Sequence, residues 1–219
     1  EVAWDPRPIS RKGSERVFRY AFEAARRRNG CPRDGTSRVT CVDKSNVTRG
    51  CQLFNRIYHE ISENYPEIET DHAYIDAFSM WVIRNPEWFD VVVTPNMFGD
   101  ISTDLASVLQ GGMGIAASAN LGDKHGMFEP VHGSAPKYAG QNKTNPMAMI
   151  NSVSLMFDWL GETNGDDDCT SVSNCIEQAV IEVLKGETLT YDLGGTAGTS
   201  DVGDAIVGTL ETLLRKHFA

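Results

Sequence analysis

The sequence predicts an α/β protein in which parallel strands alternate with helices. The segment 38–43 alternates in the manner of a β-strand, and Val91–Val93 is a short apolar run typical of a buried parallel strand. After that run, Ile101, Leu105 and Leu109 recur every four residues, which is the spacing of one helical face. A chain of 219 residues, 41% of them hydrophobic, can build one large domain or two modest ones around such elements.

The first half is expected to open with a helix that Ser14 caps and Asn29-Gly30 ends, with an inward side of Val17, Phe18, Ala21, Phe22 and Ala25. A second amphipathic helix over 48–65 stops at Pro66, and its inward side comprises Cys51, Phe54, Ile57, Tyr58 and Ile61. A short strand over 69–76 then leads into a helix over 78–83, and the central strand and helix follow.

The composition changes after residue 110, where Gly111, Gly112 and Gly114 form a breaker cluster that predicts a crossing between two structural units. The second half is expected to contain a glycine- and proline-rich loop over 129–140, with one helical turn near Pro136, and a helix from Asn145 to about 160. An acidic loop over 161–168, a helix over 175–185, a glycine-rich loop over 191–198 and a helix over 201–217 complete the prediction.

Charge and cysteine content exclude several classes of protein. The net charge of −10 argues against a general nucleic-acid binder, because binding a phosphate backbone requires many cations. No apolar run approaches the roughly 18 residues that span a bilayer, so no membrane role is expected. The 5 cysteines never form a CxxC pair, which argues against a disulfide framework or zinc site and favours a reducing compartment such as the cytoplasm.

Asp100 and Asp104 lie one turn apart on the helix after Val91–Val93, so their carboxylates share a face. Two acids there repel each other unless a cation lies between them, and Mg²⁺ or Mn²⁺ prefers such oxygen ligands. Two solvated acids are the simpler interpretation of this spacing alone. Asp76, near the start of the preceding helix, is either an N-cap or a third oxygen ligand, and the spacing leaves both open.

Lys44 follows the strand 38–43 where a helix is about to begin, a place where open α/β sheets present ligand-binding groups. A desolvated lysine there can accept or donate a proton, although a solvated lysine is the plainer interpretation. In the loop 129–140, small residues let a ligand approach the backbone, and a helix start offers N–H donors to an anion. Lys137 and Tyr138 add a cation and a phenol, whereas a histidine such as His132 is more often structural.

Four stretches, together and in this order, resemble the metal-dependent β-decarboxylating dehydrogenases: DKSNV, HAYIDAFSMWVIRNPEWFDVVVTPNMFGDISTDLAS, MFEPVHGSAPKYAG and DLGGTAGT. That family includes 3-isopropylmalate, isocitrate, homoisocitrate, tartrate and D-malate dehydrogenases, and the likeness extends through nearly the whole chain. It implies an isopropylmalate dehydrogenase-like fold of two domains, with a parallel sheet flanked by helices. Residues 1–111 would be the later part of the smaller, dimer-forming domain, and 112–219 the C-terminal part of the cofactor-binding domain.

The resemblance assigns catalytic and metal-binding roles. Asp100 and Asp104 match the family's ligands for Mg²⁺ or Mn²⁺, and Asp76 matches the acid that a second subunit of the homodimer contributes to the same metal. Lys44 matches the lysine that takes the hydroxyl proton of the substrate, also supplied across the dimer. The active site would therefore be shared between two copies of the chain.

Cofactor contacts are implied for Asn46, beside the nicotinamide, and for Glu129, His132, Gly133, Ser134, Ala135 and Asn145 around the rest of the dinucleotide. Members that use NAD usually have Asp in place of Lys137, because an acid accepts from the ribose 2′-hydroxyl and repels a 2′-phosphate. Lys137, Tyr138 and Tyr191 resemble the NADP-using isocitrate branch, although the loop after Tyr191 lacks that branch's arginine. We expect NADP to be preferred, with NAD possible.

The loop 192–199 resembles the isopropylmalate and tartrate branches, which implies oxidative decarboxylation of a 2-hydroxy acid similar to 3-isopropylmalate. Isocitrate, homoisocitrate, tartrate and D-malate are the alternative substrates. In family members, the matched region is preceded by a segment that carries substrate-binding arginines and a catalytic tyrosine. That segment has no counterpart in this sequence. We therefore expect a fragment or a short form that needs that part, and the competing class is a truncated, non-catalytic or regulatory subunit.

Overall fold

A computed structural model describes residues 1–218 and divides the chain into two compact units, Glu1–Ala106 and a second that begins at Ser107. The glycine cluster had predicted this crossing near residue 111. Each unit has its own hydrophobic core. No helix within residues 1–218 combines the length and the hydropathy that a membrane span would need.

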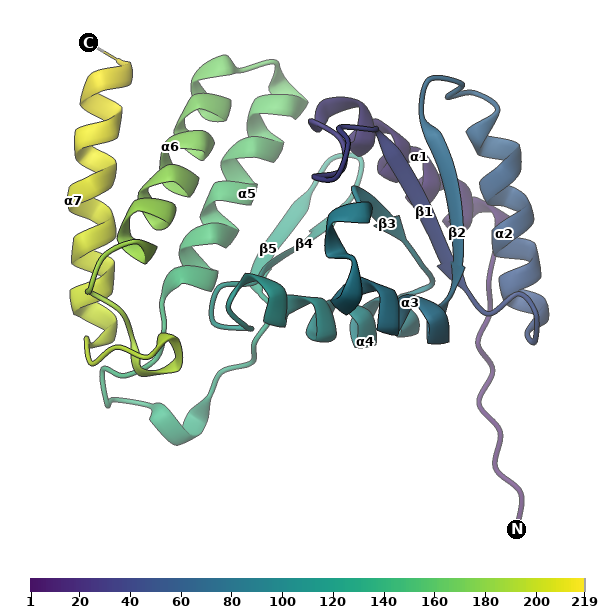
Figure 1. Ribbon diagram of the computed structural model, residues 1–219, viewed down its shortest axis with the longest axis horizontal. Helices are drawn as coiled ribbons and strands as arrows, with labels where there is room; N and C mark the ends of the chain where they lie inside the picture. The colour runs from purple at the N-terminus through teal and green to yellow at the C-terminus, as the bar shows by residue number, and fades with distance from the viewer. Residues whose placement is uncertain (219) are drawn as a thin grey trace. The chain divides into compact units, whose positions relative to one another are not determined.

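The first unit is built on a three-stranded parallel sheet in the order β2-β1-β3 (Figure 1). Its strands are β1 (Arg38–Asp43), β2 (Glu69–Tyr74) and β3 (Val91–Val93). Its helices are α1 (Arg11–Arg27), α2 (Arg49–Ser62), α3 (Ile75–Arg84) and α4 (Asn96–Ser107), with a 3₁₀ turn at Pro86–Trp88. The predicted parallel pairing is confirmed here, and every residue of the central strand β1 is buried.

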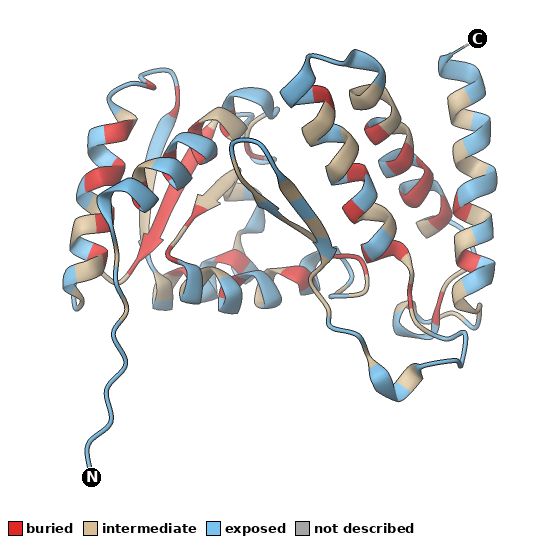
Figure 2. Ribbon diagram, turned by 180° about the vertical axis from the view of Figure 1, so that it is seen from behind, coloured by how far each residue is buried: buried red, intermediate tan, exposed pale blue. Residues whose placement is uncertain are grey.

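Both faces of this sheet are covered, as expected for parallel strands. Val39 and Cys41 of β1 point to the side of α1 and α2, whereas Val42 points to the opposite side, where it meets Phe78 and Val82 of α3. On the first side, aromatic rings fill the core, with Phe22 stacked against Tyr65 at 4.8 Å between ring centres. Figure 2 shows β1 buried along its length. The sheet is therefore a rigid support for the side chains that follow its strands.

Three local predictions for α1 and α4 are wrong. Val17 of α1, which was expected to point inward, is 39% exposed. α1 begins one turn earlier than expected, because the side chain of Ser10 accepts from the backbone of Gly13, while Ser14 lies buried within the helix. On α4, Ile101 is 63% exposed, and Leu109 falls in the 3₁₀ turn Val108–Gln110 rather than on the helix. The inward residues predicted for α2 are all confirmed.

The second unit combines an antiparallel hairpin with three long helices. The hairpin pairs β4 (Ala117–Leu121) with β5 (Gly126–Pro130), so the parallel pairing expected throughout the chain does not extend to this unit. The helices are α5 (Met147–Asn164), α6 (Asp167–Leu184) and α7 (Thr199–His217), and Figure 1 shows them side by side. The 3₁₀ turns Pro136–Tyr138 and Tyr191–Leu193 lie in the two loops that precede α5 and α7.

The acidic stretch after α5 is a tight helix-to-helix junction rather than the predicted loop over 161–168. α5 continues to Asn164, and Gly161 is buried against the start of α6, where a Cβ would come within 2.9 Å of the Asp166 carbonyl oxygen. Asp166 caps α6 by accepting from the backbone of Cys169. This close approach lets α5 and α6 pack along their length around a core that includes Met147, Ala179, Val202 and Ile206.

Candidate functional site

Lys44 and Asp76 form an ion pair at the carboxyl end of the first unit's sheet. Lys44 follows β1 directly, Asp76 lies in the first turn of α3 after β2, and Asp43 is in register with Tyr74 between these strands. The Lys44 Nζ therefore reaches Asp76 Oδ1 at 2.6 Å. This hydrogen bond lowers the pKa of the Asp76 carboxyl. Tyr74, not Asp76, occupies the N-cap of α3, which removes the capping interpretation of Asp76.

The turn that presents Lys44 is held by a buried carboxylate that sequence reasoning missed. Asp43 Oδ1 accepts from the backbone N–H of Ser45 at 2.8 Å and lies 3.1 Å from His72 Nε2. Burial raises the pKa of Asp43, but the hydrogen bonds of His72 and Ser45 outweigh it, and the pKa lies below its ordinary value. An ionised Asp43 thus fixes the backbone on both sides of Lys44. The pairing of β1 with β2 brings His72 here, and no local pattern indicates it.

Asp100 and Asp104 both lie on exposed positions of α4, one turn apart. The amide of Asn96 donates to Asp100 Oδ2 at 2.9 Å and so restrains one carboxylate at the start of the helix. Within residues 1–218, no group of three acids, cysteines or histidines comes close enough to hold a metal ion. A single chain thus presents two carboxylates on α4 and a third, Asp76, paired with Lys44. Asn46 is exposed in the turn between β1 and α2.

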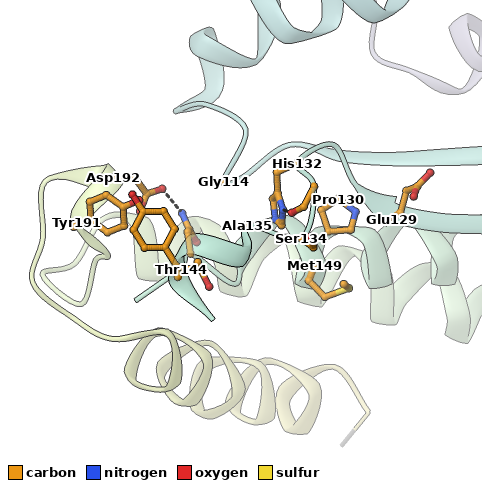
Figure 3. Close-up of a pocket in the computed structure, with 13 residues that line it drawn as sticks. Gly114, Glu129, Pro130, His132, Ser134, Ala135, Thr144, Met149, Tyr191 and Asp192 are labelled. Carbon is orange, nitrogen blue, oxygen red and sulfur yellow. Dashed lines mark hydrogen bonds between the residues drawn. The ribbon is translucent and has the colours of Figure 1, made fainter. Parts of the chain in front are cut away.

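Eight of the predicted cofactor-binding residues surround one pocket of about 550 Å³ in the second unit (Figure 3). They are Glu129, His132, Gly133, Ser134, Ala135, Tyr138, Asn145 and Tyr191. In Figure 3, Tyr191 lies at one end of the lining and Glu129 at the other. The remaining lining residues, which the sequence did not indicate, are Gly114, Pro130, Thr144, Met149 and Asp192. Two predicted residues, Lys137 and Asn46, are outside the lining.

Asn145 is fixed by its neighbours. Its amide donates to Asp192 Oδ2 at 3.1 Å, the bond drawn dashed in Figure 3, and its Oδ1 accepts from the backbone of Met147 at 2.9 Å. Gly114 packs directly against this pair of side chains, and a larger residue would not fit, since a Cβ there would lie 2.7 Å from the Asp192 carboxylate. Sequence reasoning found Asn145 but missed Asp192, because the two residues meet only when the loop before α7 folds against the start of α5.

The loop between β5 and α5 offers its backbone to the pocket. His132 Nδ1 lies 2.8 Å from the Gly133 carbonyl oxygen, which holds the imidazole against its own chain. A Cβ at Gly133 would meet nothing within 4 Å, so this part of the loop is open. Ala135 has a φ of 45°, in the left-handed region, as the chain turns into the 3₁₀ turn Pro136–Tyr138. An open backbone of this kind can lie directly against a ligand.

Two tyrosines and two lysines gather at the Tyr191 end of the pocket. The Tyr138 and Tyr191 ring centres are 5.9 Å apart. The Lys137 Nζ lies 5.6 Å from the Tyr138 ring centre, and the Lys143 Nζ lies 4.5 Å from that of Tyr191. A hydrogen bond with Tyr191, and then the charge of Lys137, lower the pKa of the Tyr138 phenol, while the same bond raises the pKa of Tyr191. This corner therefore favours an anion.

Comparisons with known proteins agree on one family. The family model described as isocitrate/isopropylmalate dehydrogenase matches residues 1–206. Homoisocitrate dehydrogenase of Methanocaldococcus jannaschii is 45% identical over 99% of this chain and 59% of its own. The 3-isopropylmalate/3-methylmalate dehydrogenase of that organism is 44% identical over 91% of this chain and 58% of its own.

Structural comparison gives the same result. The crystal structure of isocitrate dehydrogenase from Methylococcus capsulatus superposes with a TM-score of 0.82 and 42% identity, over 94% of this chain and 58% of the other. The chain thus spans less than three fifths of the length of these relatives. Since the family model covers almost all of the sequence, the chain belongs to the isocitrate/isopropylmalate dehydrogenase family.

Proposed function

We propose that the protein catalyses the oxidative decarboxylation of a 2-hydroxy acid of the 3-isopropylmalate type, with NADP as the preferred oxidant and Mg²⁺ or Mn²⁺ bound. The observation that carries the proposal is the Lys44–Asp76 pair at the carboxyl end of β1 and β2, where a buried carboxylate fixes the turn that carries Lys44. The dehydrogenase names of the relatives support the reaction class. Homoisocitrate is the first alternative substrate, followed by isocitrate, tartrate and D-malate.

The residues of this chain fit the metal that the proposal requires. Asp100 and Asp104 supply two carboxylates on one face of α4, which suits a hard divalent cation. Asp76 from the second copy of a homodimer would complete the set, and Lys44 would enter the same site beside it, because the two are adjacent on one chain. When bound, the metal ion supplies Lewis-acid stabilisation of the negative charge that develops on the substrate oxygens.

In this scheme, the chain's own residues hold the reactants and move one proton. Lys44, entering the step as a neutral amine, would take the hydroxyl proton as hydride leaves the hydroxyl-bearing carbon for the oxidant, and Asp76 would orient the ammonium group that results. The open backbone at 132–135 and the amide of Asn145 bind the adenosine part of the cofactor. The space at Gly133 and the anion-favouring corner at Tyr138 and Tyr191 fit a dinucleotide.

Ligand-induced stabilisation tests the binding part of this proposal. Mn²⁺ together with NADPH should raise the Tm of the protein, because ligands that bind only the folded state stabilise it. The double variant Asp100→Asn, Asp104→Asn should lose the Mn²⁺ contribution and keep that of NADPH. Turnover is then assayed with Mn²⁺, NADP and each candidate hydroxy acid. No Tm shift at saturating ligand, together with no turnover of any acid, would favour the non-catalytic class.

The cofactor preference should depend on the charge of the side chain at position 137. We expect Lys137→Asp to lower the ratio of NADP to NAD affinity by about tenfold or more, because an aspartate accepts from the 2′-hydroxyl and repels a 2′-phosphate. Lys124→Asp makes the same charge change in the turn between β4 and β5, and it should leave the ratio unchanged. An unaltered ratio in Lys137→Asp would rule out its role in cofactor choice.

A further inference from the structure

We infer that Lys143, which lies between the 3₁₀ turn Pro136–Tyr138 and α5, is a specificity-determining residue that binds the ribose 2′-phosphate of NADP from the side of Tyr191. The inference rests on the proposed function and deepens it. No sequence motif singled out Lys143, and its assignment comes from the way the second unit folds.

The position of Lys143 supports this role. Its Nζ lies 4.5 Å from the Tyr191 ring centre and 5.5 Å from that of Tyr138, so the ammonium group faces both rings. Lys137 approaches only Tyr138, at 5.6 Å. The Tyr138 ring thus has an ammonium group from each lysine within 6 Å of its centre. Lys143 alone also reaches Tyr191, so the two lysines can contact different sides of one anion.

The backbone around Lys143 is anchored on both sides. The carbonyl of Asn142 accepts from the backbone of Thr199 at 3.0 Å, and the carbonyl of Thr144 accepts from the Thr199 hydroxyl at 2.6 Å. The Asn142 side chain also accepts from the backbone of Ser200 at 2.9 Å. The start of α7 therefore fixes the residues before and after Lys143. A lysine on such a support loses less freedom when it binds a ligand than one on a free loop.

The two ammonium groups beside Tyr138 and Tyr191 favour the binding of an anion. Within residues 1–218, neither Lys137 nor Lys143 has a carboxylate within ion-pair distance, although the chain carries a net charge of −10. Two ammonium groups beside one ring repel each other, and a phosphate dianion placed between them turns that repulsion into attraction. Phenolic hydroxyls of Tyr138 and Tyr191 can donate to the same phosphate. A 2′-hydroxyl offers no such charge, so the corner favours NADP over NAD.

Binding of two adenosine nucleotides tests the role of Lys143 without turnover. Adenosine 2′,5′-bisphosphate and 5′-AMP differ only in the 2′-phosphate, and calorimetry at pH 8 keeps that phosphate a dianion. We expect Lys143→Met to weaken binding of the bisphosphate about tenfold, because the loss of one hydrogen bond to a charged group typically changes affinity by about that factor. Binding of 5′-AMP, which lacks the 2′-phosphate, should change by no more than about twofold. Lys143→Arg should retain most of the preference, and Lys124→Met is the matched control.

The outcomes separate this inference from the proposed function. If the unaltered chain prefers the bisphosphate and Lys143→Met keeps that preference, Lys143 is not the contact and the cofactor site stands. An equal loss for both nucleotides would also overturn the inference, because the lysine would then act on the shared adenosine or on folding. If the unaltered chain binds neither nucleotide, or binds both equally, the proposed NADP site falls and this inference falls with it.

Discussion

Replacing Lys44 by Met should lower kcat for oxidative decarboxylation by about 10²–10⁴-fold, the usual contribution of a positioned general base. The ammonium group lies 2.6 Å from the Asp76 carboxylate, and its side chain is 25% exposed, so it is placed to exchange a proton with a group at the carboxyl end of the sheet. Methionine keeps the length and the apolar contacts of the stem and removes only the titrating group. Steady-state kinetics with Mn²⁺, NADP and the accepted hydroxy acid provide the measurement.

Two further variants distinguish the loss of a proton-accepting group from the loss of a positive charge and from a general effect of substitution on folding. Lys44→Arg should be nearly as inactive as Lys44→Met, because a guanidinium stays protonated in proteins and cannot act as a base. Lys12→Met, on the exposed face of α1, should keep full kcat. If Lys44→Arg retained most of the activity, Lys44 would act through its charge alone, and the assignment of a proton-transfer role would be wrong.

Prediction from sequence succeeded where the signal was local. The alternation of β1 and the apolar spacing of α2 depend on residues a few positions apart, and both elements formed as expected. The hairpin β4–β5 was missed because Ala117–Leu121 is rich in small residues and carries none of the β-branched or aromatic residues that typify strands. The acidic residues 166–168 suggested a solvated loop, yet acids at the first turn of a helix are equally favourable.

The candidate site shows the same limit. Lys44 and Asp76 were predicted from motifs, but the Asp43–His72 contact beside the turn of Lys44 depends on the register of two strands. Asp192 lines the pocket, and Lys143 lies beside Tyr191, only because the loop before α7 folds against the start of α5. Sequence spacing cannot indicate a contact between residues about 47 positions apart, as Asn145 and Asp192 are. The residues that position a site were therefore harder to find than those expected to react.

Gly195→Ala should lower the free energy of unfolding by about 1–3 kcal/mol, the usual cost of forcing an extra methyl group into a packed site. A Cβ at this position would lie 2.5 Å from the carbonyl carbon of Leu189 and 2.8 Å from its Cβ. Backbone is on the opposing side, and it cannot rotate away as a flexible side chain could. The Leu189 carbonyl also accepts from the backbone of Ala197 at 2.9 Å, so the methyl group would open that hydrogen bond. Urea unfolding measures the loss.

The same substitution should weaken binding of adenosine 2′,5′-bisphosphate, because the loop between Leu189 and Ala197 carries Tyr191 and Asp192 into the pocket. Gly208→Ala is the matched control, since a Cβ at this exposed position of α7 would meet nothing within 4 Å. That variant should gain up to about 1 kcal/mol from helix propensity and bind the nucleotide normally. If Gly195→Ala matched Gly208→Ala in both stability and binding, the loop would be able to rearrange without loss. The close packing of Gly195 against Leu189 would then not be what holds the loop that carries Tyr191.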